Sequence, residues 1–292
     1  METVLTVIAA VVVGAALSVS GAVLQSLLRN PLAEPYMLGI VGGGALFAVL
    51  AMNLGLVALG AFVLPLASFL GSCFALALVC LIAWCAQRHR TVKGADPHLR
   101  SSSSTLIVAG YATGAFLGSL DLLALSYAEE GAFVKISKWL YGRLDLVSRA
   151  DLIFAVVTLS LVFAALFSFR RELNVMELGH DEAECLGVNT RLTMAVVIGS
   201  VALATAVSVA LAGAVGFVGL VVPHFVRRVF GPRMQVLLPV SALLGGLALV
   251  FAEFLAQRLP GDVGVGVICA IFGAPFFLFL LASSWNGEGR DI

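Results

Sequence analysis

The sequence predicts an all-α polytopic membrane protein with about nine transmembrane helices, and three observations support this fold class. Of the 292 residues, 61% are hydrophobic and 12% are charged, whereas an average soluble domain carries about 25% charged residues. The mean hydropathy is +1.07. Nine apolar stretches follow one another along the chain, each near the ~20 residues that a helix needs to cross the hydrocarbon core. These features exclude a soluble enzyme, a disordered chain and a disulfide-framed secreted domain.

The nine apolar segments are not all simple spans. The third is too long for one straight crossing and predicts a bend near Pro65, and the seventh is short and interrupted by Gly216, Gly219 and Pro223. The first is too long and too rich in glycine for a cleaved signal peptide, so we expect it to be retained. In chain order the segments are Val4–Leu28, Tyr36–Met52, Leu56–Ala86, Thr105–Leu125, Leu152–Phe169, Leu192–Leu211, Val215–Phe230, Val236–Ala256 and Val265–Ser283.

The distribution of basic residues predicts the orientation. Twelve of the 17 Lys and Arg residues lie at the ends of the first, third, fifth and seventh segments, in the loops that follow them, or at the C-terminus. Since cytoplasmic loops carry the excess of Lys and Arg, we expect the C-terminus in the cytoplasm and the N-terminus outside. Residues 87–104 then form a cytoplasmic loop and residues 126–150 an outer loop. Apolar spacing in the outer loop predicts a short interfacial helix, with Trp139 and Tyr141 as headgroup anchors.

The chain offers no chemistry of its own for ATP or for a metal. It lacks the G-x-x-x-x-G-K-[ST] loop that cradles nucleotide phosphates, and it has no hydrophilic stretch long enough for a nucleotide-binding domain. Its five cysteines include no C-x-x-C pair, and its four histidines lack metal-ligand spacing. We therefore expect no catalytic residue, metal or cofactor on this chain. The net charge of zero gives no indication of nucleic-acid binding.

Residues 173–191 form a polar segment that falls on the cytoplasmic side. Gly179 predicts the end of one short turn, and the residues after it predict a second short helix with Ala183 and Leu186 on one face. Gly187 is well placed to cap that helix at its C-terminus. Two short helices joined by glycine would form a firm knob for a soluble partner. The residues alone fit a solvated loop as well, and that is the more common use of such a segment.

A second segment combines glycine with polar residues inside a span. Gly213, Gly216 and Gly219 recur every three residues, which predicts a bare helix face that can pack backbone to backbone. His224 and Arg227 lie one turn apart at the cytoplasmic end of the same segment. We expect an interfacial hydrogen bond there rather than a metal site.

Four stretches together carry a resemblance to a known family. They are Gly21–Gly39, Leu173–Val188, Gly213–Gly231 with Leu238–Gly245, and Gly264–Leu281. In this order they resemble the permease family of the ATP-binding cassette importers for ferric siderophores, heme and cobalamin. The resemblance implies a homodimer in the cytoplasmic (inner) membrane of a bacterium or archaeon, with two cytoplasmic ATP-binding cassette subunits and an external substrate-binding protein as partners. ATP and Mg would be bound by the partner subunit, so this chain would be a transport subunit and not an enzyme.

The resemblance also assigns roles to residues by position. The segment at 173–191 becomes a pair of coupling helices that sit in a groove of the ATPase, and Thr105–Leu125 becomes a helix beside the translocation pathway. Asp121 is a candidate because a carboxylate within a membrane is costly, although it equally fits the outer headgroup level; three neighbours could line the same face. The implied site residues are Gly179, Glu182, Ala183, Glu184, Leu186 and Gly187 for ATPase coupling, Tyr111, Thr113, Ser119 and Asp121 for the pathway, and Lys135, Lys138 and Arg258 for docking of the binding protein.

Two points keep other interpretations open. The family usually has ten spans, and the span missing from this sequence corresponds to the family's first. The alternative function is a stand-alone secondary transporter or channel, which would need paired charges within the membrane; only Asp121 and Glu253 are candidates for them. An intramembrane enzyme would need a nucleophile–base pair or a histidine-rich metal site at depth, which the scattered histidines do not provide.

Overall fold

The computed structural model describes residues 2–60, 62–92, 102–144, 147–261 and 263–287, and all regular structure within these ranges is helical. Each of the nine predicted segments contains a helix. The helices are α1 (Glu2–Leu27), η1 (Pro35–Leu38), α2 (Ile40–Asn53), η2 (Leu56–Leu59), α3 (Val63–Val92), α4 (Ser102–Ser126), α5 (Glu130–Leu140), α6 (Arg149–Ser168), α7 (Arg170–Met176), α8 (His180–Cys185), α9 (Thr190–Ala212), α10 (Val218–Phe230), α11 (Met234–Arg258) and α12 (Val265–Gly287).

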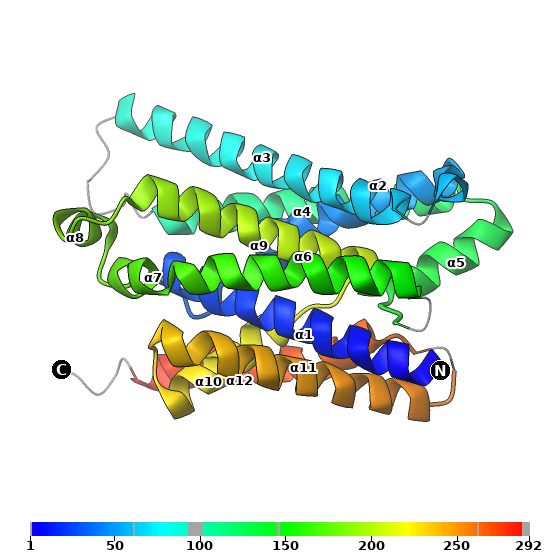
Figure 1. Ribbon diagram of the computed structural model, residues 1–292. Helices are drawn as coiled ribbons and strands as arrows, with labels where there is room; N and C mark the ends of the chain where they lie inside the picture. Colours follow the sequence, from blue (N-terminus) through cyan, green and yellow to red (C-terminus); the bar gives the residue numbers. More distant parts are fainter. Residues whose placement is uncertain (1, 61, 93–101, 145–146, 262, 288–292) are drawn as a thin grey trace.

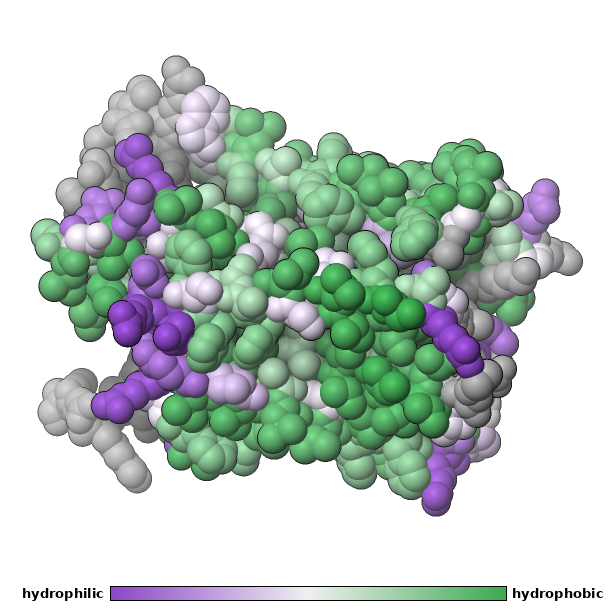
Figure 2. Space-filling view, in the orientation of Figure 1, coloured by the Kyte–Doolittle hydropathy of each residue, from purple (hydrophilic) through white to green (hydrophobic). Residues whose placement is uncertain are grey.

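Six of these helices are long and apolar enough to cross a membrane. They belong to α1, α3, α4, α6, α9 and α11, whereas Ile40–Asn53 and Val265–Leu278 are shorter apolar helices. The long helices run side by side, with α5 at one end of the bundle and α7 and α8 at the other (Figure 1). Figure 2 shows hydrophobic residues across the middle of the visible face and hydrophilic residues gathered near its two ends. This distribution is that of a polytopic membrane protein.

Helix α1 lies at the centre of the packing and has the largest buried share, 67%, among the six candidate spans. It packs against α9, α10 and α11. Two glycine pairs bring the backbones together, because a Cβ added to Gly21 would lie 1.7 Å from the carbonyl oxygen of Gly219, and one added to Gly14 would lie 2.2 Å from that of Gly245. Such close approach is how helices associate where lipid tails remove the hydrophobic driving force.

A glutamine of α1 compensates for a proline in α10. Pro223 has no N–H to donate to the carbonyl of Gly219, four residues earlier in the helix. The buried Gln25 side chain reaches across, and its Nε2 donates to the carbonyl oxygens of Gly219 at 3.4 Å and Leu220 at 3.3 Å. A carbonyl freed by proline inside a membrane bundle is tolerated when a neighbouring helix supplies such a donor.

The third apolar segment is interrupted near Pro65 as predicted, although by a break between η2 and α3 rather than a bend within one helix: α3 begins at Val63, and Pro65 lies in its first turn. Local expectations proved wrong at two other places. Gly213 and Gly216 lie in the connection before α10 rather than on a helix face, because Gly213 has a φ of 66° and ends α9. Trp139 is 4% exposed and packs between α2 and α9, so it cannot serve as a headgroup anchor.

Candidate functional site

The candidate site begins with the two short helices α7 and α8 at the end of the bundle opposite α5 (Figure 1). Helix α7 fixes the segment to the bundle by burying Leu173 and Met176. Gly179 then adopts φ 146° and separates the two helices. Helix α8 buries only Ala183, so most of its surface faces outward. The predicted pair of short helices joined at Gly179 is present.

Gly187 ends α8 as the sequence predicts. It has a φ of 84°, and its N–H donates to the carbonyl oxygen of Glu184 at 3.0 Å. The N–H of Val188 donates to the carbonyl oxygen of Ala183, also at 3.0 Å. This pair of bonds is the Schellman arrangement, which requires a left-handed residue at the position that Gly187 occupies. The turn after α8 is therefore fixed by backbone geometry and is not a loose loop.

Two leucines project from the segment. Leu178 is 61% exposed and Leu186 is 64% exposed. We expected Leu186 to share a buried face with Ala183, and this is wrong because α8 ends at Cys185 and Leu186 is its C-cap residue. In Figure 2 the end of the molecule at α8 shows hydrophobic surface beside hydrophilic surface. Exposed apolar side chains on a charged end of a membrane protein are typical of a docking site for another protein.

Two acidic residues of α8, Glu182 and Glu184, are exposed, yet each already contacts a neighbouring residue of this chain. The carboxylate of Glu182 lies over Gly179, where an added Cβ would clash with it. Glu184 Oε1 accepts a hydrogen bond from Thr190 Oγ at 2.6 Å, which ties α8 to the first turn of α9. The Glu184 carboxylate therefore stabilises the segment itself, and the Glu182 carboxylate packs against its glycine break.

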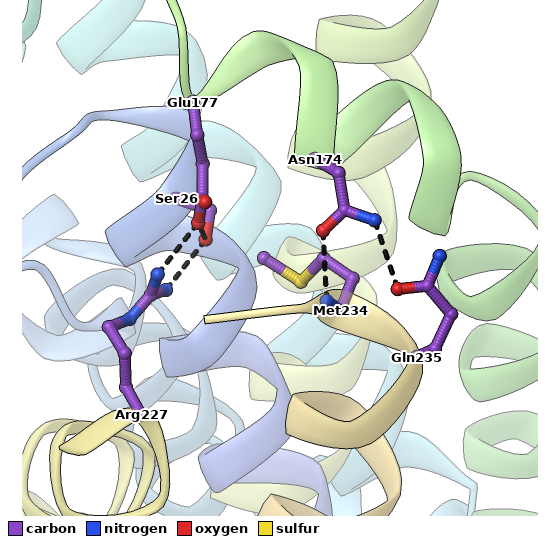
Figure 3. A network of polar contacts seen from close by, with 6 residues as sticks. All are labelled: Ser26, Asn174, Glu177, Arg227, Met234 and Gln235. Atoms are coloured by element: carbon purple, nitrogen blue, oxygen red, sulfur yellow. Dashed lines mark hydrogen bonds and ion pairs between the residues drawn. The ribbon is translucent and has the colours of Figure 1, made fainter. Parts of the chain in front are cut away.

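A polar cluster that we call the latch joins this segment to two membrane helices (Figure 3). It consists of Ser26 in the last turn of α1, Glu177 at the end of α7 and Arg227 in the last turn of α10. Arg227 Nη1 lies 2.7 Å from Glu177 Oε1, and Arg227 Nη2 donates to Ser26 Oγ at 2.7 Å. Ser26 Oγ in turn donates to Glu177 Oε1 at 2.5 Å. Charge-assisted bonds of this length are stronger than neutral ones.

A second contact joins α7 to α11. Asn174 Oδ1 accepts from the backbone N–H of Met234, the first residue of α11, at 2.9 Å, and Asn174 Nδ2 donates to Gln235 Oε1 at 3.1 Å (Figure 3). Asn174 thus caps the start of α11 from a different helix. The interfacial hydrogen bond expected at His224 is formed instead by Arg227, one turn further along α10, while the His224 ring lies 6.3 Å from the ring of Phe276. The sequence gave no signal for Ser26, Asn174 or Glu177, because their partners are distant in the chain.

The four pathway candidates on α4 do not share one face. Thr113 and Asp121 are 3% and 7% exposed, whereas Tyr111 is 74% exposed and Ser119 is exposed. Residues eight apart share a helix face, so the first two face inward and the other two outward. The expectation of one common face is therefore wrong. Asp121 is buried rather than directed to water, and its Oδ1 has no hydrogen-bond partner among the residues that the structure describes.

The basic residues expected to meet an external protein lie at the α5 end of the bundle. Lys138 is half-buried in the last turn of α5. Arg258, the last residue of α11, places its guanidinium 4.4 Å from the ring centroid of Phe254. Lys135 belongs to α5, and its side chain lies outside the described residues.

The chain matches a profile of the FecCD transport family over residues 3–283. It is 39% identical over 271 residues to the cobalamin import system permease protein BtuC of Halobacterium salinarum, covering 92% of this chain and 69% of that protein. It is 36% identical over 280 residues to the Fe(3+) dicitrate transport system permease protein FecD of Escherichia coli, covering 93% and 81%. A solved structure, described as an inward-facing metal-chelate type ABC transporter, superposes with a TM-score of 0.81 at 29% identity and covers 96% of this chain and 85% of that one.

Proposed function

Because this chain belongs to the FecCD transport family and is a permease subunit of an ATP-binding cassette importer, we propose that it works as a homodimer moving an iron-siderophore, heme or cobalamin-like cargo across the cytoplasmic membrane. Two cytoplasmic ATPase subunits bind ATP and Mg and drive the cycle, and an external substrate-binding protein delivers the cargo. The permease itself hydrolyses nothing. Its C-terminus lies in the cytoplasm, on the side that carries most of the basic residues.

The α7–α8 segment is the proposed contact with the ATPase. One observation carries this assignment: a rigid, capped pair of short helices projects Leu178 and Leu186 from the charged end of the bundle. Burying a leucine stabilises an interface by roughly 1.5–3 kcal/mol. Leu178 and Leu186 therefore supply the apolar contacts in the groove of the partner, while Gly179 and Gly187 fix the shape of the segment.

The latch connects the α7–α8 segment to the membrane helices that must move during transport. Force applied at α8 reaches α7, and the bonds of Glu177 pass it to the last turns of α1 and α10. Asn174 passes it to the first turn of α11. These three membrane helices pack on one another, so they respond together to a movement of the ATPase.

The assignment is tested by Leu186→Asp in the reconstituted importer. Removing the apolar contact and adding a charge should weaken ATPase binding by roughly a hundredfold or more and abolish cargo-stimulated transport, while the permease still inserts and purifies. Gly187→Pro should give the same result, because it deletes the N–H that donates to Glu184. Leu54→Asp is the matched control: Leu54 is 71% exposed in the α2–α3 connection, far from α8.

Three results would contradict the proposal. ATPase binding that survives Leu186→Asp would show that the partner docks elsewhere. Uptake that continues with a hydrolysis-dead ATPase would identify a stand-alone secondary transporter or channel. A fluorophore at the C-terminus that is quenched only from outside would reverse the orientation.

A further inference from the structure

A cavity of about 520 Å³ lies beside the middle of α4. Its wall includes Tyr111 and Ala115 of α4, Glu34 and Tyr36 of the α1–α2 connection, and Gly216 and Phe217 of the α9–α10 connection. Residues of α12 complete the wall. The cavity is separate from the α7–α8 segment and from the latch.

Two breaks in the helices meet at this cavity. The chain between α1 and α2 contains two prolines and ends at Gly39 with φ 70°. The connection between α9 and α10 ends at Phe217, a non-glycine residue with φ 66°, and in Figure 1 it crosses the middle of the bundle rather than an end. Non-helical backbone at membrane depth is tolerated where it is buried in protein or lines a water-filled cavity, and in secondary transporters interrupted helices of this kind form the substrate site.

Glu34 joins the two breaks. Its side chain is 5% exposed, and Oε2 accepts a hydrogen bond from the backbone N–H of Phe217 at 3.2 Å. Phe217 is the N-cap residue of α10. The carboxylate therefore holds the left-handed turn at the start of α10 and places an acidic group on the cavity wall. Burial raises the pKa of Glu34 to about 7, against the lowering effect of the bond from Phe217, so the group is ionised in part at neutral pH and more fully above it.

Away from their ends, the six candidate spans contain acidic residues but no Lys, Arg or His, whereas His224, Arg227 and Arg228 lie in α10. In the six candidate spans, Lys and Arg occur only at or next to a terminal residue, as Arg149, Arg191 and Arg258. Asp121 and Glu253 lie inside the spans, and the described wall of the cavity contains Glu34 but no Lys, Arg or His. Charges of one sign in a low-dielectric cleft concentrate solutes of the opposite sign.

We propose that this cavity is a water-filled station on the cargo path and that its acidic wall selects neutral or cationic metal chelates over anionic ones. The inference rests on the proposed importer function, since only a permease has cargo to select. It narrows the cargo among the chelates that related permeases carry, and it assigns the selection to Glu34.

Charged thiol reagents test the field in the cavity without any knowledge of the cargo. Ala115→Cys places a thiol on the wall. The full-length permease in lipid nanodiscs is treated with a cationic trimethylammonium or an anionic sulfonate methanethiosulfonate reagent. Mass spectrometry of the peptide that contains residue 115 reads the modification, so native cysteines do not contribute. Rates are normalised to those of 2-mercaptoethanol. We expect the cationic reagent to react roughly tenfold faster than the anionic one after this correction.

Glu34→Gln separates the charge from the structural role of Glu34. The glutamine oxygen still accepts from the N–H of Phe217, so the turn is kept while the charge is lost. In the Ala115→Cys permease that also carries Glu34→Gln, the ratio of the normalised cationic rate to the normalised anionic rate should fall to about one. Leu161→Cys on α6, 68% exposed and away from the cavity, is the lipid-facing control, and neither charged reagent should reach it.

Each part of the proposal, the water-filled station and the selection by Glu34, can be overturned by a particular labelling result. A residue 115 thiol that reacts with neither reagent overturns the water-filled station. Equal normalised rates, or a preference that Glu34→Gln leaves unchanged, overturn the selection by Glu34. The measurement needs no ATPase, so its failure is distinct from a failure of the coupling assignment, which Leu186→Asp tests separately.

Discussion

In its middle, α1 touches α10 and α11 through bare backbone, whereas its last turn touches α7 and α10 through charged and hydroxyl side chains. The middle contacts are the pairs of Gly21 with Gly219 and Gly14 with Gly245. The end contact is the latch of Ser26, Glu177 and Arg227. Inside the bilayer, shape complementarity is the main source of helix association. At the water boundary, an ion pair costs less to desolvate and can break and re-form.

This difference indicates that the two regions of α1 have different roles, one as a rigid contact and the other as an adjustable one. A small shift across a backbone-to-backbone contact produces a clash, so we expect the middle of α1 to move with α10 and α11 as one body. The ion pair of the latch, Glu177 and Arg227, is about a quarter exposed, which suits a contact that follows the movement of an external partner. The predictions below disturb first the rigid contact and then the adjustable ones.

The largest effect is expected from Gly21→Leu. An added Cβ would lie 1.7 Å from the oxygen of Gly219, so α1 and α10 must separate. Overpacking of this kind costs about 3 kcal/mol or more. We expect loss of monodisperse protein in size-exclusion chromatography and a large drop in thermal stability. Gly118→Leu is the control, since nothing lies within 4 Å of a Cβ at Gly118. Equal yields for the two variants would show that the glycine contact does not hold α1.

The latch should respond in a graded way. Glu177→Gln or Arg227→Gln removes one charge of the pair, and because both side chains are about a quarter exposed each change should cost about 1 kcal/mol or slightly more. The double variant should cost less than the sum, since both changes remove the same bond. We expect cargo moved per ATP hydrolysed to fall while ATPase binding is kept. Arg228→Gln, an exposed neighbour, should change neither quantity. Strict additivity of the two single changes would exclude a coupled pair.

Features of the fold that depend on neighbouring residues alone could be predicted from the sequence. Nine apolar segments, the Gly179 break and the Gly187 cap could all be predicted, because hydrophobic length and a left-handed glycine depend on neighbouring residues only. The short helix α5 was also predicted from its apolar spacing, although the burial of Trp139 was not. That burial depends on how α5 folds back onto α2 and α9, which no local pattern encodes.

The polar contacts could not be predicted, for the same reason. Gln25 is read from the sequence as one polar residue in an apolar helix, and only the three-dimensional arrangement shows that it serves the carbonyl freed by Pro223. Glu34 and Phe217 are 183 residues apart. The resemblance assigns the pathway candidates to α4 by position, and the helical period of 3.6 alone is enough to separate Tyr111 from Thr113.

The smallest effect is expected from Asn174, whose bonds to α11 are uncharged. Asn174→Ala removes the acceptor for the N–H of Met234, and the loss of such a cap costs about 1 kcal/mol. Asn174→Asp keeps an oxygen for Met234 while it loses the donor to Gln235, so it should retain most of the stability. Hydrogen exchange at the first turn of α11 measures the difference directly: faster exchange in Asn174→Ala than in Asn174→Asp is expected, and transport should fall by less than in the latch variants. Equal exchange in both would mean that α7 restrains α11 by packing alone, and the adjustable contact would then reduce to the latch.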